Sequence, residues 1–165
     1  MIPMEIDFIL NGRAVTGKVS GNLLLADYLR EHLDLKGAKI GCSRGACGSC
    51  TVLVNNIPIA ACSYFAFQLD GKSVLTIEGL ERDTTLHDLQ QAFIEHAAFQ
   101  CGYCTSGMIL VLKAMLDHEP NPSRDTVVEW ISSNICRCTG YAQIIAAAEA
   151  IIAMRANTGP TEAVS

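Results

Sequence analysis

Residues 41–50 read GCSRGACGSC, and their three cysteines have the spacing C-x4-C-x2-C. A fourth cysteine follows after eleven further residues. This is the spacing of the plant-type [2Fe-2S] site, which needs four thiolates. The first predicted ligand set is Cys42, Cys47, Cys50 and Cys62. Interleaved glycines let the backbone wrap tightly and turn its N–H groups toward cluster sulfurs. These glycines are Gly41, Gly45 and Gly48.

The other four cysteines form a C-x2-C pair and, much later in the chain, a C-x-C pair. The second predicted ligand set is Cys101, Cys104, Cys136 and Cys138. All eight cysteines therefore fall into two complete sets of four soft ligands. Because [2Fe-2S] clusters are one-electron centres held by four thiolates, we predict two clusters and a role in conducting electrons.

Other roles for the eight cysteines fit the sequence less well. Disulfides would need an oxidising compartment, and Met1 to Asp7 lack the charged region and apolar run of a signal peptide. Tetrahedral Zn²⁺ would accept C-x2-C beside C-x-C, but the gap between Cys42 and Cys47 and its glycines suit a diamond-shaped cluster better. A Rieske centre needs two histidine ligands. All four histidines lie outside the cysteine loops: His32, His87, His96 and His118.

Composition limits the classes of partner. Half of the 165 residues are apolar and only 18% are charged, which excludes disorder and suggests surfaces buried against other chains. A net charge of −5 with scattered Lys and Arg argues against nucleic acid as a partner.

The most apolar stretch, Ile144 to Met154, is shorter than the roughly 20 residues that span a bilayer, so we expect no membrane span. Without a signal peptide, we expect a cytoplasmic protein.

Strand signals dominate residues 1–80. Alternating apolar residues and turn dipeptides predict two hairpins: residues 5–10 with 13–19 around Asn11-Gly12, and residues 51–54 with 57–60 around Asn55-Asn56. Asn22 is predicted to cap a helix through Leu33, and residues 73–77 form one more strand. The predicted helix has an apolar face of Leu25, Tyr28, Leu29 and Leu33. This order is that of a β-grasp ferredoxin, so we assign residues 1–80 to a β-grasp [2Fe-2S] domain.

Helical signals follow, and we assign residues 81–156 to a four-helix [2Fe-2S] domain and residues 157–165 to a loose C-terminal tail. The fold class is α+β. The predicted helices are residues 84–99, 106–117, 123–133 and 139–156. The first places Leu86, Leu89, Phe93 and Ala97 on one face. Both remaining cysteine pairs lie between predicted helices, so two helical hairpins can bring them together at one end of a bundle.

Three motifs carry a resemblance to a known family: residues 41–52, residues 100–104 (QCGYC) and residues 134–141 (NICRCTGY). They resemble the iron–sulfur subunit of the molybdenum hydroxylases, the xanthine oxidase family, across roughly residues 5 to 155. Relatives include the small subunits of carbon monoxide dehydrogenase, quinoline and nicotine dehydrogenases, and 4-hydroxybenzoyl-CoA reductase. The resemblance implies an oxidoreductase whose substrate is turned over by another subunit, so the substrate cannot be read from this chain.

The resemblance also implies a route for the electrons. They would pass from a molybdenum pyranopterin in a large subunit, through the helical-domain cluster and then the ferredoxin-like cluster, to FAD in a medium subunit. The complex would be a dimer of heterotrimers. Gln100 and Cys138 match positions at which family members touch the pyranopterin. A self-standing electron carrier and a zinc-stabilised interaction module are the alternatives.

Two residues depart from the family pattern. Ser106 stands where relatives commonly have proline, and we expect a small loss of rigidity at the first helical turn. Ser49 replaces a common alanine. Its hydroxyl could donate toward cluster sulfur and raise the potential slightly, but we expect it to face solvent.

Overall fold

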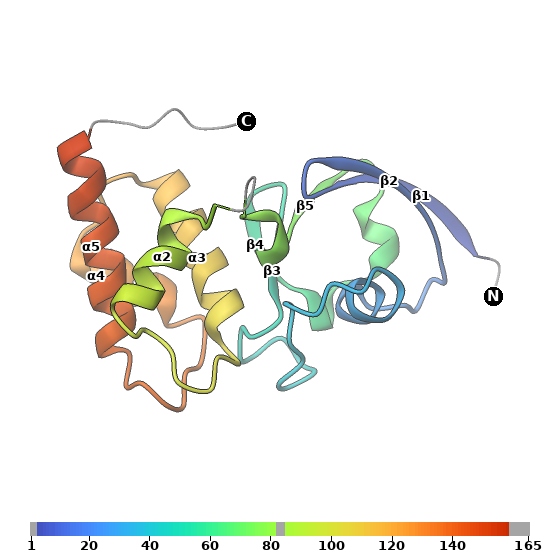
Figure 1. The fold of residues 1–165 in the computed structure, drawn as a ribbon. Helices are drawn as coiled ribbons and strands as arrows, with labels where there is room; N and C mark the ends of the chain where they lie inside the picture. Colours follow the sequence, from blue (N-terminus) through green and yellow to red (C-terminus); the bar gives the residue numbers. More distant parts are fainter. Residues whose placement is uncertain (1–2, 82–84, 159–165) are drawn as a thin grey trace.

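A five-stranded sheet and a group of helices lie side by side in the computed structural model, which describes residues 3–81 and 85–158 (Figure 1). The strand order is β2-β1-β5-β3-β4. The helices α2 to α5 lie beyond β3 and β4, on the side of the sheet away from β1 and β2 (Figure 1). No helix among the described residues is long and apolar enough to cross a membrane.

Both predicted hairpins are present. Strands β1 (Met4–Leu10) and β2 (Arg13–Val19) pair antiparallel, and Asn11 and Gly12 have φ values of 51° and 79°. Strands β3 (Thr51–Val54) and β4 (Ile57–Ala60) pair in the same way, with φ values of 49° and 63° at Asn55 and Asn56. Positive φ at both central residues defines the type I′ turn that matches the twist of a hairpin. The turn dipeptides therefore predicted both hairpins correctly.

Strand β5 (Ser73–Leu75) joins the hairpins, pairing parallel with β1 and antiparallel with β3. It is shorter than the predicted strand of residues 73–77. The Asn11 side chain accepts a hydrogen bond of 2.9 Å from the Thr76 N–H, and the 3₁₀ turn η4 (Ile77–Gly79) then begins. A side chain has therefore replaced the strand partner at Thr76.

The helix predicted to be capped by Asn22 and to run to Leu33 begins later than predicted and ends one residue earlier, at His32. The α-helix α1 (Leu25–Asp27) continues as a π-helical turn, η1 (Tyr28–His32). Asn22 lies in a turn, Leu24 forms a β-bridge with Phe65, and the Leu25 N–H donates to the Tyr64 carbonyl at 2.7 Å, so the helix begins only at Leu25. The predicted apolar face is buried as far as Leu29. Two short 3₁₀ turns follow β4: η2 (Ala61–Ser63) and η3 (Ala66–Leu69).

The helical region contains four described helices: α2 (Asp88–Glu95), α3 (Thr105–His118), α4 (Arg124–Ile131) and α5 (Ala142–Thr158). Helix α2 is shorter than the predicted residues 84–99, of which residue 84 lies outside the described ranges. Ala97 has a φ of 47° and is exposed, so the chain has left the helix and Ala98 takes the buried position. Helix α5 continues through Thr158, and the predicted tail is thus wrong at residues 157–158. The remaining tail residues lie outside the described ranges.

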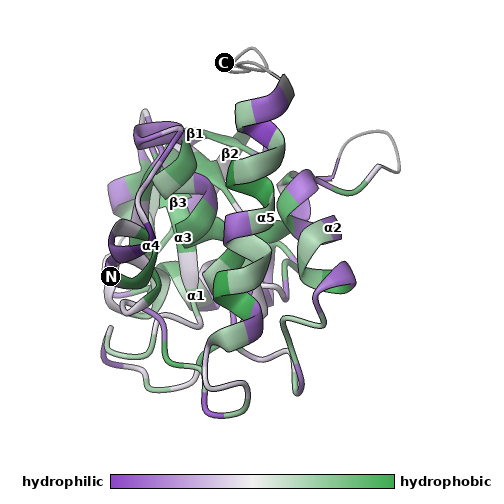
Figure 2. Cartoon of the chain, turned by 90° about the vertical axis from the view of Figure 1, so that its left-hand side faces the viewer, coloured by the Kyte–Doolittle hydropathy of each residue, from purple (hydrophilic) through white to green (hydrophobic). Residues whose placement is uncertain are grey.

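Helix α3 is central to the packing. Nearly all of its residues from Ser106 to Leu116 are buried, because α3 packs against strand β3 as well as against α2 and α4. In Figure 2 much of the ribbon of this helix is coloured green, the colour of hydrophobic residues. One hydrophobic cluster joins the helices to Leu53 of β3, and a second lies between the sheet and residues 25–29. The sheet and the helices therefore share an apolar contact through β3 and α3.

Candidate metal centres

The loop of residues 41–50 turns its backbone toward thiols of the first quartet. The Gly45 N–H donates to Cys62 Sγ and the Ala46 N–H to Cys42 Sγ, both at 3.3 Å. Gly45 has a φ of +71°, a backbone conformation that residues with a side chain rarely adopt, so glycine permits this turn. A Cβ at Gly41 would lie 3.1 Å from Cys47 Sγ. The loop therefore directs the N–H groups of Gly45 and Ala46 toward thiols of the first quartet.

Hydrogen bonds and burial shift the pKa values of the first-quartet thiols in opposite directions. N–H groups of Arg44, Ala46 and Cys47 lower the pKa of Cys42 to about 6. Burial raises the pKa of Cys50 to about 11. Donors that stabilise a thiolate at Cys42 favour the ligand form of cysteine, whereas a buried thiolate at Cys50 needs a positive partner such as iron. The loop thus fits a cation-bearing group.

Ser49 does not face solvent as expected from the sequence. Its side chain is 4% exposed, and its hydroxyl lies 3.7 Å from Cys47 Sγ. The tight turn at Gly48, where φ is +72°, points the next residue inward. Ser49 therefore belongs to the surroundings of the first quartet.

The second quartet is assembled from two loops, as predicted. Cys101 Sγ and Cys138 Sγ lie 3.5 Å apart and both residues are exposed, while Cys104 and Cys136 are each 8% exposed. The Cys136 N–H donates to the Tyr141 hydroxyl at 2.9 Å, and that hydroxyl donates to the Asn134 carbonyl at 3.1 Å. One aromatic side chain thus closes the loop that carries the C-x-C pair.

The pKa values of the second-quartet thiols are also shifted. Burial raises the pKa of Cys104 to about 12. Burial opposes ionisation of Cys136 as well, but hydrogen bonds from Thr139, whose Oγ1 lies 3.1 Å from Sγ, outweigh it and lower the pKa. A buried pair of cysteines beside hydroxyl and N–H donors again fits a metal-bound thiolate pair.

The thiols associate in pairs rather than around one point. Among the described residues, no group of three His, Cys, Asp or Glu side chains is placed to hold a single metal ion. Each iron of a [2Fe-2S] cluster takes two of the four protein ligands, so the pairs of thiols fit this cluster. The interacting pairs are Cys42 with Cys47, Cys50 with Cys62, Cys101 with Cys138, and Cys104 with Cys136.

Hydrogen bonds connect the two cysteine regions directly. The Ile135 N–H donates to the Cys47 carbonyl at 2.9 Å, and the Asn134 amide donates to the Gly48 carbonyl at 3.2 Å. The Ser106 hydroxyl donates to the Gly37 carbonyl at 2.6 Å, a contact that a proline at this position could not make. Partners more than sixty residues apart leave no local sequence signal, and these contacts were therefore not predicted from the sequence.

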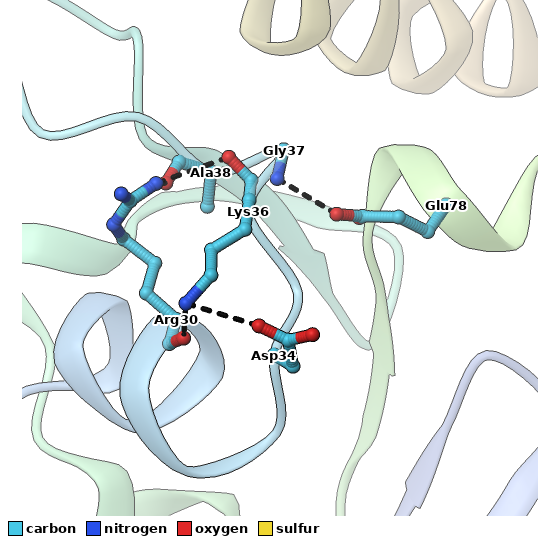
Figure 3. A network of polar contacts seen from close by, with 6 residues as sticks. All are labelled: Arg30, Asp34, Lys36, Gly37, Ala38 and Glu78. Atoms are coloured by element: carbon cyan, nitrogen blue, oxygen red, sulfur yellow. Dashed lines mark hydrogen bonds and ion pairs between the residues drawn. The ribbon is translucent and has the colours of Figure 1, made fainter.

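The segment that leads into the first cysteine loop is held from both sides (Figure 3). The Arg30 guanidinium donates to the carbonyls of Lys36 and Ala38 at 3.0 and 3.1 Å. On the opposite side, the Glu78 carboxylate accepts the Gly37 N–H at 2.7 Å. These contacts fix the backbone to which Ser106 of α3 is hydrogen-bonded.

Gln100 is exposed and directly precedes Cys101, whose thiol contacts that of Cys138. Among the described residues, no hydrogen bond of the Gln100 side chain is found. The two residues that the resemblance assigns to the pyranopterin thus lie at the same exposed end of the helical region.

Two thiolate quartets, one beside a β-grasp sheet and one between helical hairpins, define a two-cluster iron–sulfur electron-transfer protein. Residues 8–71 match the family model of the 2Fe-2S iron-sulfur cluster binding domain, and residues 76–149 match that of the [2Fe-2S] binding domain. The chain belongs to the iron–sulfur subunits of the molybdenum hydroxylase family.

Individual relatives agree with this assignment. The nicotinate dehydrogenase small FeS subunit of Eubacterium barkeri is 43% identical over 95% of this chain and 100% of its own length. The crystal structure of quinoline 2-oxidoreductase from Pseudomonas putida 86 matches with a TM-score of 0.90 and 42% identity, covering 98% of this chain and 100% of that one. Nicotine 6-hydroxylase small subunit from Paenarthrobacter nicotinovorans is 43% identical over 87% of both chains. This chain is accordingly a subunit of an oxidoreductase.

Proposed function

We propose that this chain carries electrons between a molybdenum pyranopterin in a large subunit and FAD in a medium subunit, through two [2Fe-2S] clusters. Molybdenum exchanges two electrons with substrate, whereas each cluster carries one at a time. The chain itself turns over no substrate. Its eight thiolates would hold the irons, and its N–H and hydroxyl groups would set how readily each cluster accepts an electron.

One observation carries this proposal: the hydrogen bond from the Ile135 N–H to the Cys47 carbonyl. Cys47 is a ligand of the first quartet, and Ile135 is bonded directly to Cys136, a ligand of the second. Backbone bonds and this single hydrogen bond therefore connect the two clusters without an intervening gap. Such a connection favours electron transfer between the clusters.

The exposure of each quartet supports two separate docking ends. Cys101 and Cys138 are exposed in the helical region, and residues 43–46 are exposed in the first cysteine loop. Cys50, Cys62, Cys104 and Cys136 are buried. Electrons would enter the helical-domain cluster from the pyranopterin, with Gln100 and Cys138 facing it, and leave the other cluster toward FAD.

The proposed assembly is a dimer of heterotrimers in the cytoplasm, a reducing compartment that keeps thiolates available for iron. Exposed apolar side chains near the second quartet are suited to burial in an interface, and they include Phe99, Tyr103 and Ile135.

Purification of the native complex through a tag on this chain tests the proposal. We expect two larger chains to co-elute, one with FAD and one with molybdenum pyranopterin, as identified by mass spectrometry and cofactor analysis. A native size-exclusion peak with this chain alone would contradict the proposed partners and favour a self-standing carrier.

A further inference from the structure

We propose that Asn134 is a positioning residue that fixes the two cysteine regions relative to each other and thereby sets the electronic coupling between the clusters. This inference rests on the proposed electron-transfer function. Asn134 is no cluster ligand. It is 1% exposed and lies two residues before Cys136.

Asn134 and its neighbour hold two consecutive carbonyls of the first cysteine loop. The Asn134 Nδ2 donates to the Gly48 carbonyl at 3.2 Å, and the Ile135 N–H donates to the Cys47 carbonyl at 2.9 Å. Two hydrogen bonds to consecutive carbonyls fix the direction of this part of the loop more firmly than the backbone hydrogen bond alone. The side-chain contact therefore holds the geometry of the backbone contact that connects the clusters.

Three segments that carry cluster ligands meet at this amide. A Cβ at Gly48 would lie 2.2 Å from Asn134 Oδ1. At Gly107, in the first turn of α3, a Cβ would lie 2.3 Å from the Gly48 carbonyl and 2.7 Å from Asn134 Nδ2. Both positions exclude every side chain larger than hydrogen. The segments bearing Cys47, Cys104 and Cys136 are thus packed around one buried hydrogen bond.

The Gly48 carbonyl does not need Asn134 as a hydrogen-bond donor. It also accepts from the Thr51 hydroxyl at 2.7 Å and from the Thr51 N–H at 3.0 Å. On the other side, the Ser133 hydroxyl that contacts Asn134 Oδ1 also donates to the Trp130 carbonyl at 2.7 Å. Loss of the amide therefore leaves no other buried polar group without a partner, so a variant should fold. The contribution of Asn134 is the connection between the loops.

Asn134→Leu tests this role, because leucine has a similar size and branches at the same atom but cannot donate. Asn134→Ser serves as a second variant that cannot overpack against Gly48 and Gly107. Ser106→Ala is the matched control. It also removes one hydrogen bond between the helical region and the segment of residues 37–48, but at Gly37, away from the Cys47 carbonyl. Each protein is purified as the native complex and analysed for iron, sulfide and the electron paramagnetic resonance of both reduced clusters.

We expect both Asn134 variants to retain the iron content and both cluster signals of the wild type. At low temperature, the electron paramagnetic resonance signals of two nearby paramagnetic clusters split each other, and this splitting should be lost or narrowed in both Asn134 variants. Electron exchange between the clusters should also slow. Ser106→Ala should keep the splitting. A purely structural contribution to folding would lower stability without moving this signature.

Unchanged splitting in both Asn134 variants would overturn the proposal. So would loss of a whole cluster in both variants, since Asn134 would then be needed for cluster binding and not for relative placement. A wild-type complex without two iron–sulfur signals would refute the proposed function itself, which separates that failure from a failure of this inference.

Discussion

Gln100 is the residue that we propose to contact the pyranopterin. An amide offers a donor and an acceptor to the mixed edge of a heterocycle without adding charge. Its side chain is exposed beside the outer thiol pair of the second quartet. A partner subunit that covers this end of the molecule would bury the amide, and burial makes each unmet hydrogen bond costly.

Gln100→Leu should leave the iron content of the complex unchanged and weaken pterin retention or slow reduction of the helical-domain cluster. A buried partner left unsatisfied costs about 1 to 3 kcal/mol, or roughly a five- to 150-fold effect. Molybdenum and pterin analysis of the complex, with rapid-mixing reduction, measures both. Gln91→Leu, an exposed glutamine on α2, is the control. Unchanged pterin content and reduction rate in Gln100→Leu would show that the pterin lies elsewhere.

Single residues differed in how well the sequence predicted them. The spacing of the eight cysteines was sufficient to group them, because each quartet is composed of short motifs. The solvent-facing position expected for Ser49 was wrong, and the contact of Ser106 was not predicted, since burial and a hydrogen-bond partner 69 positions away depend on tertiary packing. Asn134 was part of a recognised motif but received no role, because its partner Gly48 is 86 positions distant.

At the scale of elements, helix α2 depends on a histidine cap. His87 Nδ1 accepts the Leu89 N–H at 3.2 Å, and the His87 N–H donates to Gln90 Oε1 at 2.9 Å, which together form a capping box. Only a neutral imidazole can accept this bond. Burial lowers the pKa of His87 below its usual 6.5, and the opposing influence of Asp88 is smaller.

Acid should therefore destabilise the protein through His87. Because the folded-state pKa is depressed, the unfolded chain binds the proton first, and this contribution is complete above about pH 6.5 and is lost as pH falls through the folded-state value. His87→Asn keeps a capping oxygen but does not titrate. Thermal unfolding at pH 7.5 and 5.5 should show a smaller loss of stability in this variant. An equal loss in both proteins would rule out His87 as a contributor.

The elements that local chemistry specifies were predicted well, and those that distant contacts specify were not. Asn-Gly and Asn-Asn fix type I′ turns within four residues, so both hairpins were correct. Helix α1 begins later than predicted because Leu24 forms a β-bridge with Phe65. Helix α2 ends earlier than predicted, before Ala97, which has a positive φ. Neither event has a signal within the segment itself.

At the scale of the whole molecule, the order of a sheet region followed by a helical region was evident from the change in hydrophobic period. The contact between them was not. Helix α3 packs on β3, and hydrogen bonds from Tyr103, Ser106, Asn134 and Ile135 reach the segment of residues 37–48. This junction places the two quartets against each other, which is the arrangement that two clusters in series need.

Metal, sulfide and magnetic resonance analysis of the purified holoprotein tests the central claim most directly. Two complete quartets predict about four iron and four acid-labile sulfide per chain and two distinguishable S = 1/2 signals after reduction. Cys47→Ser should remove only the signal of the ferredoxin-like cluster, and Cys104→Ser only that of the helical-domain cluster. A colourless protein with near-equimolar zinc and no sulfide would contradict the account.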